Sequence, residues 1–191
     1  MQTVKIIRDN DAQNPRTEYD NLGTMAAAHR RYDLGDKDGH AELARLLGCD
    51  PDDIRTICER LEKRRDIIAL PLYLYDHSGI TISTTPFSCP WDSGQVGFIF
   101  ITAEKARAEY GWKLITKARR AKIEDYLRGE VETYDQYLTG DVYGFTVEDE
   151  AGDEVDSCWG FYGHDVDANG IIGHLPPELH AAAREAARSP L

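Results

Sequence analysis

Residues 70–101 are LPLYLYDHSGITISTTPFSCPWDSGQVGFIFI, and this stretch decides the fold that the sequence predicts. The run Ile67–Tyr75 is rich in β-branched and aromatic residues, which suit the half-buried surface of a strand. Asp76–Gly79 supplies turn chemistry, and strand-like runs follow at Ile80–Thr84 and Gln95–Ile101. Strands joined in this way predict an antiparallel, three-stranded meander.

Helical patterns precede the meander. Thr24 is a candidate N-cap for a helix over Met25–Tyr32. The sequence Asp50–Asp53 predicts another helix start, with Asp50 as N-cap, a proline at the first helical position and acids in the first turn. We therefore expect residues 41–66 to form a helical segment.

Helix and strand patterns also follow the meander. Thr116 is a candidate cap of a long amphipathic helix that ends near Leu138, because the apolar residues between them keep a three-and-four spacing. Residues 141–148 and 154–162 predict a C-terminal hairpin. This order predicts an α+β fold, in which the meander and the hairpin form one antiparallel or mixed sheet with helices packed on one face.

The length of 191 residues fits a single domain, 1–191, within which residues 41–66 could form a subdomain. No apolar run approaches the length that crosses a bilayer, so no membrane association is expected. The N-terminus lacks the pattern of a signal peptide, and the four cysteines have no paired spacing. These features predict a cytoplasmic protein with reduced thiols.

A formal net charge of −12 argues against direct nucleic-acid binding, which needs a basic surface that contacts phosphates. Two interpretations remain. The acidity keeps the protein soluble, or an acidic surface competes for the nucleic-acid groove of another protein.

The charges are unevenly distributed along the chain. Between Glu104 and Lys122 there are seven basic residues and two acids, whereas Glu124–Asp167 contains fourteen acids and only Arg128 as a base. The long helix therefore opposes its own macrodipole, which favours a surface arranged for a partner. The acidic residues that we expect to bind this partner are Glu124, Asp125, Glu130, Glu132, Asp135, Glu148, Asp149, Glu150, Asp153, Glu154 and Asp156.

The turns of the meander carry the residues with the most reactive side chains. His77 lies on one turn, and Cys89 and Asp92 lie on the next loop. A thiol and an imidazole that meet there could act as nucleophile and base, with His29 as a further member of the site. The structural alternative is that Asp76 and Ser78 fold the turn through side-chain to backbone bonds.

A second pattern resembles a metal loop. Asp165, Asp167 and Asn169 occupy the first, third and fifth positions of an EF-hand-like loop. The twelfth position, where a bidentate glutamate belongs, is Pro176, so an Asx-type turn is the preferred interpretation. Nucleotide-binding fingerprints and nucleophile elbows are absent from the sequence, and we expect no cofactor.

Several motifs, including HRRY, YDHSG, CPWDSGQVG, YDQYLTGD and DSCWGFYG, resemble a family of uncharacterised proteins of bacteriophages, prophages and plasmids. The matching stretches are Asn14–Arg16, Asp20–Met25, His29–Tyr32, Leu34–Asp36, Leu70–Tyr73, Tyr75–Gly79, Cys89–Gly97, Tyr134–Asp141 and Asp156–Gly163. The resemblance implies a mobile-element context and assigns no catalytic residues. Small acidic proteins in that context often inhibit host defence, as anti-restriction and anti-CRISPR proteins do.

The leading hypothesis is therefore a non-enzymatic inhibitor that acts in the bacterial cytoplasm. Its acidic residues would bind a host defence protein or complex as a nucleic-acid mimic. The alternative is a small enzyme or ligand-binding protein with a site around His77, Cys89 and Asp92. The sequence leaves both a homo-oligomer and an accessory role in replication or packaging open.

Overall fold

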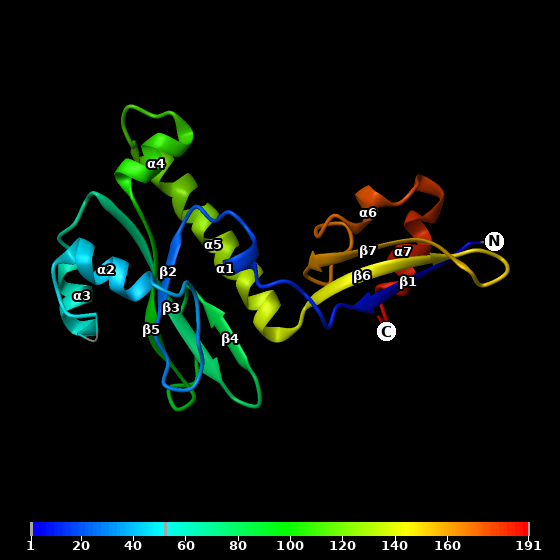
Figure 1. Cartoon of the computed structure of the whole chain (residues 1–191), viewed down its shortest axis with the longest axis horizontal. Coiled ribbons are helices and arrows are strands. Elements are labelled where there is room, and N and C mark those ends of the chain that lie inside the picture. Colours follow the sequence, from blue (N-terminus) through cyan, green and yellow to red (C-terminus); the bar gives the residue numbers. More distant parts are fainter. Residues whose placement is uncertain (1, 52, 191) are drawn as a thin grey trace. The chain divides into compact units, whose positions relative to one another are not determined.

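The computed structural model of the chain describes residues 2–51 and 53–190 (Figure 1). Where one domain is expected from the length, the chain divides into two compact units. Unit 1 comprises Met1–Pro15 and Gln136–Leu191, and unit 2 comprises Arg16–Asp135. Asp52, part of a predicted helix start, lies outside the described residues.

Unit 2 is built on a four-stranded antiparallel sheet with the strand order β2-β5-β3-β4. The strands are β2 (Thr24–Ala27), β3 (Ile67–Asp76), β4 (Ile80–Ser83) and β5 (Ser93–Thr102). The helices that accompany them are α1 (Pro15–Glu18), α2 (Gly39–Leu47), α3 (Ile54–Leu61), α4 (Ala103–Tyr110) and α5 (Lys117–Thr139).

The predicted meander is wrong in its strand order. Strand β3 lies between β4 and β5, so the loop after β4 carries the chain to the opposite edge of β3. Strand β3 has ten residues and pairs along both edges, whereas β4 has only four. Strand β4 pairs only with Tyr73–Asp76 of β3, whereas β5 pairs with β3 from Ile67 to Tyr75.

Two helix predictions also need correction. Residues 24–27 form strand β2, not the start of a helix, and β2 pairs with β5. The start of α2 lies directly against β2, since a Cβ atom on Gly39 would be 2.5 Å from the carbonyl oxygen of Met25. Helix α3 begins at Ile54 with Asp53 as its N-cap, three residues later than Asp50 predicts.

Helices cover both faces of this sheet, and not one face as the sequence predicts (Figure 1). Leu43 of α2 and Ile57 of α3 share a hydrophobic cluster with Phe98 and Phe100 of β5, so residues 41–66 form part of the core of unit 2. On the other face, Leu127 of α5 and Ile99 of β5 lie together beside Gly23. Helix α5 begins as predicted, because the Thr116 hydroxyl accepts a hydrogen bond from the amide of Arg119 at 3.3 Å.

Unit 1 contains a three-stranded antiparallel sheet with the order β1-β6-β7. Its elements are β1 (Thr3–Arg8), β6 (Val142–Glu148), β7 (Glu154–Tyr162), α6 (Ile171–His174), the 3-10 helix η1 (Pro177–Leu179) and α7 (His180–Ala186). The predicted C-terminal hairpin is confirmed as β6 and β7, but it forms a second sheet with β1. Ile6, Phe145 and Phe161 pack with Leu179 and Ala183 in the core of this unit.

The α+β class with antiparallel sheets is therefore confirmed. Within residues 2–51 and 53–190, no helix has both the length and the apolar composition needed to cross a membrane.

Candidate functional site

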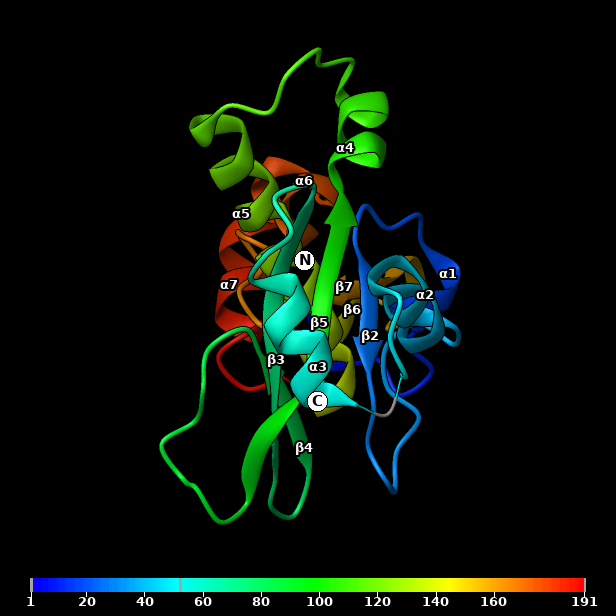
Figure 2. The same cartoon turned by 90° about the vertical axis from the view of Figure 1, so that its left-hand side faces the viewer.

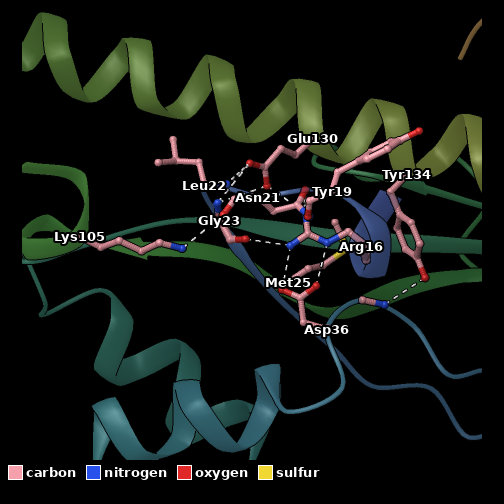
Figure 3. A network of polar contacts seen from close by, with 11 residues as sticks. Arg16, Tyr19, Asn21, Leu22, Gly23, Met25, Asp36, Lys105, Glu130 and Tyr134 are labelled. Atoms are coloured by element: carbon pink, nitrogen blue, oxygen red, sulfur yellow. Dashed lines mark hydrogen bonds and ion pairs between the residues drawn. The ribbon is translucent and has the colours of Figure 1, made fainter. Parts of the chain in front are cut away.

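The acidic residues on α5 are largely engaged inside unit 2. Figure 3 shows Arg16, whose side chain is 1% exposed, between the carboxylates of Asp36 and Glu130. Its guanidinium donates to Asp36 at 2.8 Å and to Glu130 at 2.9 Å, and Glu130 also accepts from the amide of Leu22 at 2.6 Å. Burial alone would lower the pKa of Arg16, but the bonds to the two carboxylates outweigh burial and raise it. Glu130 is thus part of an internal network.

Three other predicted partner-binding residues of α5 have partners within unit 2, either inside the fold or at its surface. Asp135 accepts hydrogen bonds from the hydroxyl of Thr81 at 2.6 Å and from the amide of Ile82 at 2.7 Å, so it ties α5 to strand β4. Asp125 forms an ion pair with Arg128 at 2.7 Å, and Glu124 lies between Arg120 and Arg128. Glu132 is exposed.

The predicted acids of unit 1 are arranged differently, because they gather on the β6–β7 hairpin. Glu148 forms an ion pair with Lys5. Asp149 folds the turn, since its carboxylate accepts from the amides of Ala151 at 2.8 Å and Asp153 at 3.1 Å. The remaining predicted side chains are exposed, and they are Glu150, Asp153, Glu154 and Asp156.

The formal charge follows the same division between the units. Unit 1 has 13 acids and four basic residues, a formal charge of −9, whereas unit 2 has 21 acids and 18 basic residues, a formal charge of −3. Most of the net negative charge of the chain therefore lies in the smaller unit, unit 1.

Strand β7 also has two exposed apolar side chains. Val155 is 52% exposed and Trp159 is 46% exposed. The indole of Trp159 lies on Gly144 of β6, where a Cβ atom would be 2.3 Å from the ring. Cys158 packs against the core of unit 1, so its neighbour Trp159 lies on the opposite face of the sheet.

The structure brings together the residues of the alternative site. The carboxylate of Asp92 lies 3.4 Å from Nδ1 of His77 and accepts a hydrogen bond from the thiol of Cys89 at 3.7 Å. Asp92 therefore contacts both groups, and the thiol donates to a carboxylate. In a catalytic cysteine–histidine pair, the imidazole itself accepts the proton of the thiol. The arrangement of Cys89, Asp92 and His77 differs from such a pair, because the thiol donates to Asp92 and not to His77.

Beside this cluster lies a pocket of about 500 Å³, lined in part by His29, Arg30, Arg31, Asp76 and Trp91. The segment after β2, the end of β3, the β4–β5 loop and the start of β5 form it, at one end of the sheet of unit 2 (the lower end in Figure 2). Sequence reasoning placed His29 here but missed the two arginines. In the sequence, the adjacent basic residues of the HRRY motif indicate a positively charged segment and could have identified these two arginines.

The EF-hand-like residues are used within their own turn. Asp165 accepts from the amide of Asp167 at 3.0 Å, Asn169 accepts from the amide of Ile171 at 3.0 Å, and Asp167 pairs with Arg184 at 2.7 Å. In the part of the chain that the structure describes, no three His, Cys, Asp or Glu side chains are placed to hold a metal ion.

Comparison of the chain with protein-family models, curated proteins and solved structures gives no match. The candidate functional surfaces are therefore the β6–β7 hairpin of unit 1 and the pocket of unit 2.

Proposed function

We propose that the protein is an inhibitor encoded by a phage or another mobile element, and that it binds a nucleic-acid-binding protein of a host defence system. The observation that carries this proposal is the concentration of exposed carboxylates on one hairpin of a unit with a formal charge of −9. In Figure 1 the turn of this hairpin extends beyond helices α6 and α7 of the same unit. A projecting row of carboxylates can enter a groove that normally receives phosphates.

The carboxylates and the apolar side chains of β7 have different roles in this proposal. Glu150, Asp153, Glu154 and Asp156 attract a basic groove over a distance and raise the rate of association. Trp159 and Val155 supply the apolar contact that slows dissociation, because half-exposed tryptophans are frequent anchors of protein interfaces. Acids held inside unit 2, such as Glu130, stabilise the fold and do not take part.

The test is to capture partners of the tagged protein from a bacterial lysate at low and at high salt, and to add duplex DNA as a competitor. The proposal predicts a nucleic-acid-binding defence protein that is retained at low salt and released both by high salt and by DNA. A captured protein that DNA does not displace would contradict the mimicry, and so would capture that is insensitive to salt.

A further inference from the structure

The pocket of unit 2 has features that the proposed inhibition does not use. Its volume of about 500 Å³ lies within the range of small-molecule sites, and polar and aromatic side chains converge on it. Two of its lining residues are held together, because the amide of Asp76 at the end of β3 donates to the carbonyl oxygen of Asp92 in the β4–β5 loop at 2.8 Å. The pairing of β3 with β5 also shifts register between Leu72 and Tyr73, where β5 has the extra residue Val96, and bulges of this kind are frequent beside binding sites.

Most of the charges in the pocket are already paired. Asp76 binds the guanidinium of Arg31 and lies 3.4 Å from the hydroxyl of Tyr32, while Asp92 contacts His77 and Cys89. The guanidinium of Arg31 also lies over the ring of Tyr32, 5.4 Å from its centroid.

Of the two arginines that line the pocket, Arg31 is paired with Asp76 and Arg30 remains. It is exposed and lines the pocket, and within residues 2–51 and 53–190 it has no hydrogen-bond or ion-pair partner. A guanidinium presents several donors in one plane and suits a phosphate group. The chemistry of this corner of the pocket therefore favours an anion.

The rim of the pocket favours a planar ring. Trp91 lines the pocket and is 91% exposed, so almost the whole indole is available for stacking. The side-chain amide nitrogen of Gln95 donates to the carbonyl oxygen of Gly97 at 3.3 Å, and its side-chain oxygen can accept a hydrogen bond from another donor, such as an exocyclic amine. His29 stacks on Tyr32 with centroids 5.0 Å apart and adds a second aromatic wall.

We infer that this pocket binds a free mononucleotide, with its phosphate on Arg30 and its base against Trp91. The volume accommodates a single nucleotide, and the net charge of −12 opposes the approach of a polyanionic strand. Binding involves unit 2 alone and is independent of the proposed inhibition by unit 1.

The test is isothermal titration calorimetry of the full chain with the four ribonucleoside 5′-monophosphates, ribose 5-phosphate, the free nucleosides and a single-stranded oligonucleotide. Saturable binding of at least one monophosphate with a stoichiometry of one is expected. Ribose 5-phosphate lacks the base and nucleosides lack the phosphate, so both bind at least about 10-fold more weakly. Absence of binding by every monophosphate, equal binding of ribose 5-phosphate, or tighter binding of the oligonucleotide would overturn the inference.

Single substitutions test whether the mononucleotide binds at this pocket. Arg30→Gln and Trp91→Ala each weaken monophosphate binding by about 10-fold or more, because a stacked base alone contributes on the order of 1–3 kcal/mol. Arg55→Gln is the matched control, since Arg55 is an exposed arginine of α3 that does not line the pocket. Both site residues are exposed, so melting temperatures stay near that of the wild type. Equal affinity in Arg30→Gln and Arg55→Gln contradicts the assignment.

Discussion

Unit 1 and unit 2 use their acidic side chains in opposite ways. In unit 2, Glu130 and Asp135 lie within the fold and accept hydrogen bonds from Arg16, from backbone amides and from Thr81. In unit 1, Asp153 and Asp156 lie exposed on a hairpin. The difference shows that a row of acids in a sequence can specify internal structure in one region and a charged surface in another.

The same difference determines how strongly a substitution of an acidic residue affects folding stability in each unit. Removing a charge inside the network of unit 2 leaves its partners buried and unpaired, which is costly. Removing a charge from the hairpin of unit 1 leaves an exposed site that water solvates, which costs little for folding. We therefore expect stability effects to be largest in unit 2 and binding effects to be largest in unit 1.

The largest expected stability effect comes from Arg16→Ala. This change leaves the carboxylates of Asp36 and Glu130 facing each other without their cation, and we expect unit 2 to lose about 3–5 kcal/mol. Hydrogen exchange read by mass spectrometry would report the loss as faster exchange within Arg16–Asp135. The control is Arg184→Ala, which breaks an exposed ion pair with Asp167 and should change stability much less. Equal losses in the two variants would contradict the structural role of Arg16.

A smaller loss is expected from Gly144→Val in unit 1. A Cβ atom at this position would lie 2.3 Å from the Trp159 ring, so the indole must move off β6. We expect a loss of about 1–3 kcal/mol in chemical denaturation, together with a shift of the indole resonance of Trp159. An unchanged resonance would show that the ring does not rest on Gly144.

Gly129→Ala should stabilise unit 2. Gly129 lies within α5, and a Cβ atom there would meet no other atom within 4 Å. Alanine is favoured over glycine in a helix interior by about 1 kcal/mol, and thermal melting would detect the gain. Gly111→Ala is the comparison, because Gly111 ends α4 with φ +64° and alanine is strained there. A gain from Gly111→Ala would contradict this account of the helix end.

The smallest effect is a dependence on pH in unit 1. The hydrogen bond from Arg184 lowers the pKa of Asp167, so the folded state favours the carboxylate. The stabilisation is present above the unfolded pKa of about 4 and is lost as the pH falls through the lower folded value. Urea denaturation should therefore show Asp167→Asn less stable than the wild type at neutral pH, with the gap closing in acid. A gap that is constant with pH would contradict the pairing.

Local patterns predicted part of the fold. The apolar run of β3, the hairpin of β6 and β7 and the hydroxyl cap at Thr116 depend on neighbouring residues, and all three occur in the structure. The helix predicted over Met25–Tyr32 is wrong at its start, because methionine and alanine favour helices but the pairing of β2 with β5 makes residues 24–27 extended.

The parts that could not be predicted depend on contacts between distant residues. The order β2-β5-β3-β4 is set by which edge of β3 each strand reaches, and no local pattern records it. Likewise, the internal role of Glu130 depends on Arg16, which lies 114 residues away in the chain. The cluster of His77, Cys89 and Asp92 was found because its members lie on neighbouring turns, whereas Arg30 comes from a different part of the sheet.

The central claim is that the acidic hairpin of unit 1 binds the partner, and one comparison of two matched variants tests it. The first variant neutralises the hairpin with Glu150→Gln, Asp153→Asn, Glu154→Gln and Asp156→Asn. The second neutralises four exposed acids of unit 2 that are outside the predicted partner-binding set, with Glu59→Gln, Glu62→Gln, Glu104→Gln and Glu109→Gln. Both change the net charge equally, so a general charge effect acts on both. The account predicts that only the hairpin variant loses the salt-sensitive partner that duplex DNA displaces. Retention by both variants, or equal loss from both, would contradict it.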